Sequence, residues 1–502
     1  MKKYQLFRIA LFLTLFAVIL LPSCTRDKNR RIAGELRYGY VSELTTLDPL
    51  NPKNTADGRS ILFNVFEGLV RPHMDGTFIP CIAESWTIEQ DGLVYNFTLN
   101  ENIYFHDNTP LNSNDVKFSL EAAIAAGFDG LNNIEEINIL DEHKIVIKLK
   151  NKDPDFLPFL TVGIVKANNT NRERVIIGTG PFFIENYNPQ RNLELKKFHN
   201  YRQSNLPYLE KVTIVFFANY DALMVAFRGG SIDGAFLTGA MAAQLDHRHF
   251  DIFNNNSAAV QLLALNNAAA PLDDLRVRQA INYAVNVQEI IDAAFFGSGS
   301  PSGSPIIPGL SVYYENSLSY QYNPQMAQTL LSQAGYNNTN RLSLEITVPS
   351  NFTMHVDTAQ VIVSQLEKAG INASIKMVDW STWLSEVYFG RRYQATIISL
   401  DSPIVSPRGF LNRYHSNDGN NFINFNNADF DRVYDAVLTE TDVSARIRLY
   451  KEAQRIITEN AASVYIQDIL YFITFRGGAF GGALNYPLYV IDFASIYGIS
   501  NN

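Results

Sequence analysis

The stretch from residue 342 to residue 400 constrains the fold more than any other part of this sequence. Apolar and polar residues alternate from Leu342 to Val348 and again from Ile371 to Met377, which is the period of strands with one buried face. Between them, apolar residues at helical spacing run from Val356 to Leu366, and Gly370 follows as a helix stop. Strand, helix and strand with short connections predict a parallel pair with a right-handed crossover.

The next apolar run, from Ala395 to Leu400, is almost continuous, as expected for a strand that is covered on both faces. It ends at Asp401. Because ligands of open parallel sheets bind beyond the carboxyl ends of the strands, Asp401 is the first candidate for a binding residue. Leu93, together with the alternating residues up to Leu99, predicts a separate hairpin that turns at Asp91-Gly92.

Length and composition limit the class of protein. A chain of 502 residues exceeds what one hydrophobic core usually supports, which predicts more than one domain. With 46% hydrophobic and 18% charged residues the chain is globular. Its net charge of −9 argues against nucleic acid or anionic lipid as a partner, since both attract clusters of Lys and Arg.

The amino-terminal segment predicts export. A basic start at Lys2, Lys3 and Arg8 precedes an apolar run from residue 9 to residue 21. This run is shorter than the roughly 20 residues that a membrane-spanning helix needs. Residues 1–23 are therefore predicted to be a lipoprotein signal peptide.

Leu21-Pro22-Ser23-Cys24 resembles a bacterial lipobox, although Pro22 is an unusual residue there. Cys24 would then carry lipid, residues 24–33 would form a tether, and the protein would be extracytoplasmic and anchored to a bacterial membrane. A retained membrane anchor with unmodified Cys24 is the alternative. If Cys24 is lipidated, Cys81 is the only remaining thiol and no internal disulfide can form.

Motifs of common enzyme classes are absent from the sequence. None of the eight histidines has the HExxH spacing, and there is neither a GxSxG elbow nor a Walker lysine. The spacing of His247 and His249 is better explained by an exposed polar loop than by a metal site. We therefore expect a protein that is not an enzyme and that has no catalytic residues, no metal ligands and no cofactor.

Five sequence blocks carry a resemblance to a known family. In chain order they are AESWTIEQDGLVYNFTLNENIYFHDNTPLNSNDV (residues 83–116), GTGPF (178–182), GGSID (229–233), DDLRVRQAINYA (273–284) and NPQMAQTLLSQAGY (323–336). Together they resemble the extracytoplasmic solute-binding proteins of family 5, the peptide and nickel transporter family. Members of this family close around a ligand and deliver it to an ATP-driven importer.

The resemblance implies an α/β, two-lobed periplasmic-binding-protein fold of type II, in the large three-segment class with an extra inserted domain. Lobe I would combine residues 34–52, 178–262 and 468–502. An inserted subdomain of lobe I would span residues 53–177, and lobe II would span residues 263–467. Because the chain would cross between the lobes twice, the crossings would form a hinge.

The resemblance also implies a ligand site. Asp401 would pair with the α-ammonium group of a peptide by charge-assisted hydrogen bonds, while the strand backbone at Ser399 and Leu400 would pair with the peptide main chain. Arg408 would meet a ligand carboxylate. The sequence departs from peptide-binding relatives at Ile398, where they often have tryptophan. The other expected ligand contacts are Tyr40, Val41, Ser42 and Glu43 on the wall of lobe I, with Trp380 or Trp383 as the floor of a pocket.

The function implied is that of a substrate-binding lipoprotein of an ABC importer, which captures peptides between its lobes and delivers them to membrane permease subunits. Three alternatives stay open. The same receptor could take a nickel chelate or an oligosaccharide, or the chain could be a surface lipoprotein without a role in transport.

Overall fold

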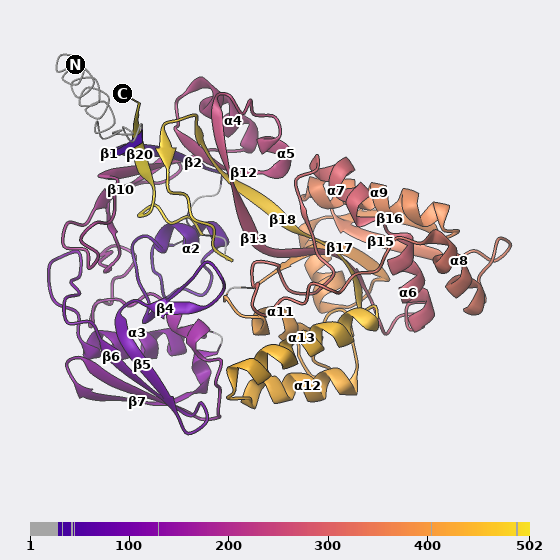
Figure 1. The fold of residues 1–502 in the computed structure, drawn as a ribbon, viewed down its shortest axis with the longest axis horizontal. Coiled ribbons are helices and arrows are strands. Elements are labelled where there is room, and N and C mark those ends of the chain that lie inside the picture. Colours follow the sequence, from indigo (N-terminus) through magenta and orange to yellow (C-terminus); the bar gives the residue numbers. More distant parts are fainter. Residues whose placement is uncertain are drawn as a thin grey trace, which may run out of the picture.

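The computed structural model (Figure 1) describes residues 29–32, 34–41, 44, 46–128, 130–402, 404–487 and 490–501. The predicted signal peptide, the lipidation residue Cys24 and the predicted wall residues Ser42 and Glu43 lie outside this part of the chain. Within it, we find no helix that has both the length and the apolar character needed to cross a membrane.

An eleven-stranded mixed sheet forms the backbone of the molecule. In sheet order its strands are β16 (Asn372–Val378), β15 (Ser343–Pro349), β17 (Ala395–Asp401), β13 (Phe250–Leu265), β18 (Ser463–Arg476), β12 (Gly234–Thr238), β2 (Glu35–Tyr40), β11 (Lys211–Phe216), β10 (Asn192–Lys197) and β9 (Phe182–Asn188), with β14 (Ser300–Pro301) beside β18.

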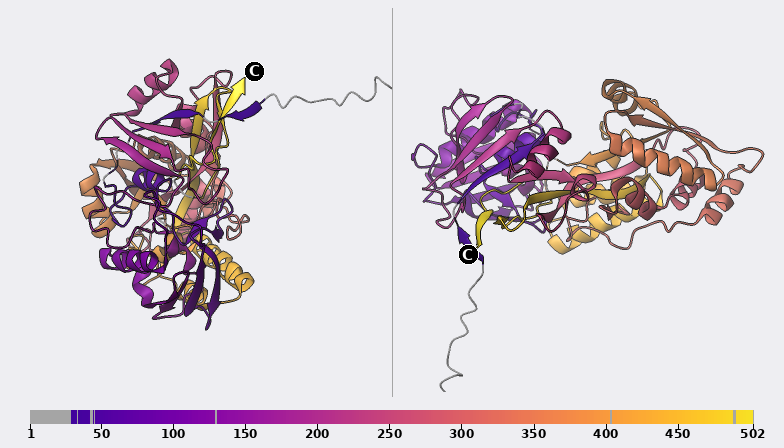
Figure 2. Two further views of the ribbon diagram at one scale, coloured as in Figure 1. Left: turned by 90° about the vertical axis from the view of Figure 1, so that its left-hand side faces the viewer. Right: turned by 90° about the horizontal axis from the view of Figure 1, so that it is seen from above.

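The two longest strands of this sheet, β13 and β18, join two halves of the molecule. They pair antiparallel from Phe250↔Arg476 at one end to Ala264↔Ser463 at the other. At the first end β18 pairs with β12, and at the second end β13 pairs with β17. Figures 1 and 2 show a body on either side of this pair. We refer to the half with β2 and β9 to β12 as lobe I, and to the half with β15 to β17 as lobe II.

The predicted strand, helix and strand are confirmed in lobe II. β15 and β16 pair in parallel, from Ser343↔Asn372 onward, and α9 (Thr353–Lys368) connects them. Gly370 follows with φ +90°, a left-handed conformation that glycine adopts without strain. β17 is also buried on both faces as predicted, because Ile397 belongs to one apolar cluster and Ile398 to another.

Helices cover both faces of the sheet in lobe II. One face packs against α9 together with α6 (Leu275–Ala284), α7 (Val287–Phe295) and α8 (Pro324–Gln333). The other face packs against α12 (Ala428–Thr439), α13 (Val443–Glu459), a π-helix over Trp383–Phe389 and the short α11 (Arg408–Leu411) with the 3₁₀ turn Asn412–Tyr414. The single-turn α10 (Trp380–Thr382) leads into the π-helix.

A separate four-stranded antiparallel sheet lies beside lobe I, in the order β5 (Ala83–Glu89), β6 (Val94–Leu99), β8 (Lys144–Leu149) and β7 (Ile134–Asp141). The predicted hairpin is confirmed, since Glu89 pairs with Val94 across a turn that contains Gly92 at φ +85°. This part of the chain also holds α2 (Ala56–Leu62), β3 (Val70–Pro72), β4 (Phe78–Pro80), α3 (Ser113–Ala126) and the 3₁₀ turns Leu131–Asn133 and Leu157–Thr161. Its apolar core is continuous with that of lobe I.

The remaining elements complete lobe I. α4 (Tyr220–Gly229) and α5 (Gly239–Ala242) flank β12. A small sheet pairs β1 (Asn29–Ile32) with β20 (Tyr497–Asn501) and β20 with β19 (Phe480–Gly481). The two ends of the described chain therefore lie side by side on lobe I.

Candidate functional site

A cavity of about 430 Å³ lies where the part of the chain that holds the four-stranded sheet faces lobe II and the crossing strands. We refer to this part as the inserted part, because it lies between β2 and β9 in the chain. Its walls come from residues around α2, from the turn Leu157–Thr161 and from the end of β17. Ala259 on β13 and Tyr471 on β18 complete it. This volume is within the range of sites for small molecules, roughly 300 to 1,000 Å³.

Most of the lining is apolar. Five aromatic residues take part, which are Phe63, Phe66, Phe128, Phe159 and Tyr471. Leu62, Val70 and Val162 add aliphatic surface from the same side of the cavity. A ligand of this cavity would therefore bury apolar groups of its own, because apolar surface gains free energy when it leaves water.

Four charged residues line the cavity, and they divide into two kinds. Glu67 is paired with Arg202 at 3.1 Å, and Arg71 is paired with Asp492 at 2.8 Å. Within the described residues, neither Arg59 nor Asp401 takes part in an ion pair. Those two charges are available to a ligand.

Asp401 ends β17, where its backbone carbonyl accepts a hydrogen bond from Arg413 Nη2 at 2.9 Å. Its side chain is exposed and lines the cavity, as does its neighbour Ser402. Arg413 thus fixes the backbone at the strand end, and the carboxylate of Asp401 accepts no hydrogen bond from the described part of the protein. This leaves its oxygens free to accept hydrogen bonds from a cation.

Arg59 lies on α2, on the opposite wall. Its Nη1 donates to the carbonyl of Asn54 at 2.6 Å. The side chain is open to the water of the cavity but surrounded by protein, and this burial lowers the pKa of its guanidinium. The carboxylates of Asp401 and Asp57 act in the other direction and raise that pKa.

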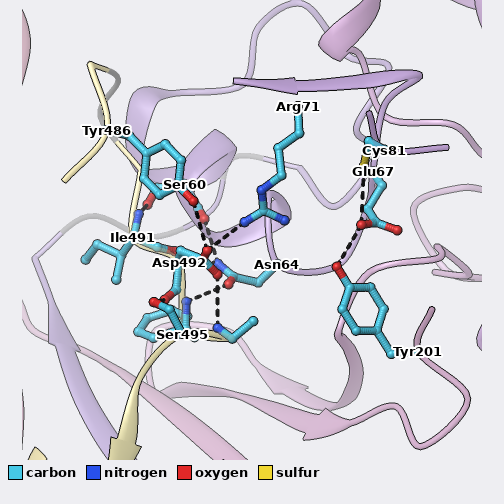
Figure 3. Close-up of polar contacts among 12 residues, drawn as sticks. Ser60, Asn64, Glu67, Arg71, Cys81, Tyr201, Tyr486, Ile491, Asp492 and Ser495 are labelled. Atoms are coloured by element: carbon cyan, nitrogen blue, oxygen red, sulfur yellow. Dashed lines mark hydrogen bonds and ion pairs between the residues drawn. The ribbon is translucent and has the colours of Figure 1, made fainter. Parts of the chain in front are cut away.

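The C-terminal segment holds α2 in place (Figure 3). Asn64 donates to the carbonyl of Ile491 and accepts from the backbone N–H of Phe493, both at 2.8 Å. The backbone N–H of Ile491 donates to Ser60 Oγ at 3.0 Å. Because these partners are buried, losing one would leave a polar group unsatisfied, at a cost of about 1–3 kcal/mol.

The buried carboxylate of Glu67, which follows α2, contacts several side chains beside the cavity (Figure 3). It accepts hydrogen bonds from Tyr201 Oη at 2.8 Å and from Arg202 Nε at 3.1 Å, and the Cys81 thiol lies 3.4 Å away. Burial, and then the charge of Glu67, raises the pKa of the Cys81 thiol to about 12. Cys81 is therefore an unreactive packed thiol, because thiolate is the nucleophilic form.

The GTGPF block contacts the segment that follows α2. The backbone N–H of Gly180 donates to the carbonyl of Val65 at 2.9 Å, and a Cβ on Gly178 would lie 2.1 Å from that same oxygen. The glycines are thus required by close approach of two backbones. His106 joins this contact, since it accepts from the N–H of Gly178 at 3.2 Å and donates to the carbonyl of Gly180 at 3.1 Å.

Burial lowers the pKa of His106 to about 4, from an ordinary value of 6.5. A depressed pKa means that the unfolded chain binds the proton more tightly, so stability is lost as pH falls from about 6.5 toward 4. Between about pH 7 and pH 5 we expect His106 to cost about 2 kcal/mol of unfolding free energy. Urea denaturation of the wild type and of His106→Gln at both pH values measures this.

His106→Gln is expected to be less stable at neutral pH but to lose less on acidification. His355, whose pKa burial also lowers to about 4, stays in both proteins and cancels in the comparison. Equal pH dependence in the two proteins would contradict the assignment.

The predicted wall residues of lobe I do not line the cavity. Tyr40 is buried, with its hydroxyl 3.2 Å from Ser60 Oγ, and Val41 is half-buried against the apolar cluster of α4. Ser399 and Leu400 precede Asp401 on β17, yet Leu400 packs into the core of lobe II. Of the ligand contacts predicted in the described chain, only Asp401 lines the cavity.

The tryptophan pair lies elsewhere in lobe II. The rings of Trp380 and Trp383 stack with centroids 5.0 Å apart, and Trp383 Nε1 donates to Thr396 Oγ1 at 2.9 Å. Trp383 is buried, whereas Trp380 packs on the ring of Phe352 near the surface. Both belong to the packing of lobe II.

Arg408 is bound within the protein. Its Nη1 contacts Asp153 Oδ2 at 2.5 Å, and its guanidinium lies over the ring of Phe159 at 5.4 Å. Next to this pair, Asp155 Oδ2 accepts hydrogen bonds from Ser406 Oγ at 2.8 Å and Tyr450 Oη at 2.7 Å. Two aspartates of the inserted part thus fasten it to lobe II beside the cavity.

The sequence offered little signal for the other lining residues. Arg59, Phe63 and Phe66 belong to α2 and the segment directly after it, and Phe159 belongs to a 3₁₀ turn 100 residues further on. Their only common feature is their position in space. None of the five blocks that carry the resemblance covers α2 or the turn Leu157–Thr161.

Comparisons with known proteins agree with this architecture. The family described as "Bacterial extracellular solute-binding proteins, family 5 Middle" matches residues 77–422. Heme-binding protein A of Haemophilus influenzae is 26% identical over 426 residues, which are 76% of this chain and 77% of the relative. Glutathione-binding protein GsiB of Escherichia coli O1:K1 is 26% identical over 458 residues, which are 86% of this chain and 88% of the relative.

Among solved structures, the periplasmic binding protein DppA of Helicobacter pylori, in complex with the peptide STSA, aligns with a TM-score of 0.75 and 23% identity. The alignment covers 95% of this chain and 100% of that chain. The expected α/β, two-lobed fold of type II periplasmic binding proteins is thereby confirmed.

Proposed function

This chain belongs to the bacterial extracellular solute-binding proteins of family 5, and we propose that it captures peptides for an ABC importer in the cavity between its lobes. The names of its relatives are those of binding proteins, for heme and for glutathione, and the DppA structure contains a peptide. DppA is an ABC transporter-associated binding protein, which agrees with the expected role in an ABC importer.

The observation that carries the proposal is the position of Asp401. A carboxylate without an ion-pair partner in the described chain stands at the carboxyl end of a buried strand and lines the cavity. A free α-ammonium group is the part of a peptide that such a carboxylate binds best, through charge-assisted hydrogen bonds. A neutral oligosaccharide has no cation to compensate this charge, so the carboxylate favours a peptide over such a sugar.

Closure of the lobes would trap the peptide. The register of β13 against β18 shifts between Asn256 and Val260, and again between Gln261 and Leu262, next to the cavity residue Ala259. Such irregularities bend strands locally, so we place the hinge there. The segments 34–52, 178–262 and 468–502 would move as lobe I with the insert 53–177, against 263–467 as lobe II.

We further propose that Cys24 is lipidated and holds the protein on the outer side of a bacterial membrane, where permease subunits receive the ligand. This rests on the signal-peptide pattern of residues 1–23 and on the lipobox-like segment. The family is one of extracytoplasmic proteins, which agrees with this location.

Native mass spectrometry of the chain that begins after Cys24 tests the function. After gentle purification, the protein is challenged with a pool of di- to pentapeptides. We expect masses of bound peptides of several sequences, because backbone and terminal contacts do not depend on the side chains. A single mass that is not a peptide would instead indicate a receptor for a metal chelate or a sugar, and a protein that stays empty would indicate a surface lipoprotein without a role in transport.

A further inference from the structure

We propose that Arg59 is the carboxylate-binding residue of the cavity, and that the ligand is a short zwitterion whose ammonium group meets Asp401 while its carboxylate meets Arg59. The inference rests on the proposed function and narrows it to a class of ligand. Neither the resemblance nor the sequence pattern assigned a role to Arg59.

The balance of charge inside the cavity supports this assignment. Of the four charged residues that line it, Glu67 and Arg71 are neutralised by Arg202 and Asp492. Arg59 and Asp401 remain as one positive and one negative charge without an ion-pair partner among the described residues. A ligand with both charges compensates both residues, whereas a ligand with a single charge leaves one of them desolvated and unpaired, which is costly.

The separation of the two groups also supports the assignment. They form no ion pair at 4.0 Å or less in the part of the chain that the structure covers, yet both line the same cavity of about 430 Å³. This volume lies near the lower end of the roughly 300 to 1,000 Å³ of small-molecule sites, so the ligand that spans the two groups is short.

The hydrogen-bonding capacity of Arg59 suits this role. A guanidinium carries five N–H donors, and the Nη1 bond to the carbonyl of Asn54 occupies one of them. The remaining donors suit a carboxylate, which arginine binds by two parallel hydrogen bonds. The side chain starts from a helix that the C-terminal segment fixes through Ser60 and Asn64, so its position is held before the ligand arrives.

The two charges also lie on opposite sides of the cleft. Arg59 belongs to α2 in the inserted part beside lobe I, and Asp401 belongs to β17 of lobe II. A ligand that binds both would link the lobes, and the closed form would gain contacts that the open form lacks. The ligand would therefore bind the closed state more tightly than the open state. This difference in affinity is what a ligand-driven closure requires.

Titration calorimetry with one dipeptide in two forms tests the inference. The probe is Ala-Phe, whose aromatic ring suits the apolar lining, with either a free or an amidated carboxyl end. We expect the wild type to bind the free acid about 10- to 100-fold more tightly than the amide, as for loss of a hydrogen bond to a charged group. In Arg59→Gln, both forms should bind with nearly equal and weaker affinity, while Arg59→Lys should keep part of the preference.

Arg432→Gln is the matched control. Arg432 is an exposed arginine on the helix α12 and does not line the cavity, and its replacement changes the net charge by the same amount as Arg59→Gln. It should retain the wild-type preference. Wild-type protein that binds acid and amide equally would overturn the inference and leave the peptide receptor intact. If Arg59→Gln loses the same affinity for the acid and for the amide, Arg59 has a merely structural role. If the wild type binds neither form of the dipeptide and none of the pooled peptides, the proposed function itself is overturned.

Discussion

Replacing Arg408 with glutamine is expected to lower the free energy of unfolding by about 3–5 kcal/mol, the usual cost of leaving a buried charge without its partner. The partner is Asp153, whose side chain is only 6% exposed and lies 2.5 Å from the guanidinium. Glutamine can still donate a hydrogen bond but cannot compensate the charge. Chemical denaturation monitored by fluorescence measures the loss.

Two comparisons make this result specific. Arg455→Gln removes an exposed arginine that pairs with Glu452 and Glu459, and should cost no more than about 1 kcal/mol. The double variant Asp153→Asn with Arg408→Gln should lose much less than the sum of the single variants, since no unpaired charge remains. A loss below about 1 kcal/mol in Arg408→Gln would show that the inserted part and lobe II do not depend on this contact.

The loss should also depend on pH, in a known direction. Burial raises the pKa of the Asp153 carboxyl, and Arg408 opposes that effect. Without Arg408 the pKa of Asp153 in the folded protein rises further above its value in the unfolded chain. The folded protein then binds the proton more tightly than the unfolded chain, so it is most stable at low pH and loses stability as pH rises through the folded-state pKa. The difference between Arg408→Gln and the wild type is therefore expected to be greater at about pH 7 than at about pH 4.5.

Asp401→Asn is expected to weaken binding of a peptide with a free amino terminus about 30-fold or more, as for truncation of one partner in a desolvated charge pair. The same peptide with an acetylated amino terminus should bind both proteins almost equally, because it has no ammonium group for the carboxylate to meet. Titration calorimetry with the two peptides measures the difference. Equal losses for both would remove the ammonium role of Asp401 and leave only a structural one.

Local sequence patterns predicted the parts of the fold whose causes are local. The alternation from Leu342 to Val348, the helical spacing up to Leu366 and the continuous run ending at Leu400 correspond to β15, α9 and β17. The same logic located Asp401, since a strand end is also a sequence feature. The overall two-lobed arrangement came from the resemblance of the sequence blocks, because pairing of β13 with β18 joins residues about 200 positions apart.

The rest of the cavity had no local signature. Arg408 looks like an available cation in the sequence, but it lies beside Asp153, 255 positions away, and is neutralised there. Arg59 looks like an ordinary arginine on a short helix, and only the folded chain shows that it lines the same cavity as Asp401 and has no ion-pair partner among the described residues. Pairing of charges depends on the tertiary structure, and this is why the sequence could propose candidate charges but could not choose between them.

The continuous sheet has a consequence for the way the molecule moves as a whole. Domains on a flexible linker rotate in solution partly independently of each other, but here β13 and β18 belong to both lobes and are hydrogen-bonded to each other from Phe250↔Arg476 to Ala264↔Ser463. Rotating one lobe freely would break that ladder. We therefore expect the protein to tumble in solution as one elongated body. A fluorophore fixed to either lobe would report the rotational diffusion of the entire molecule.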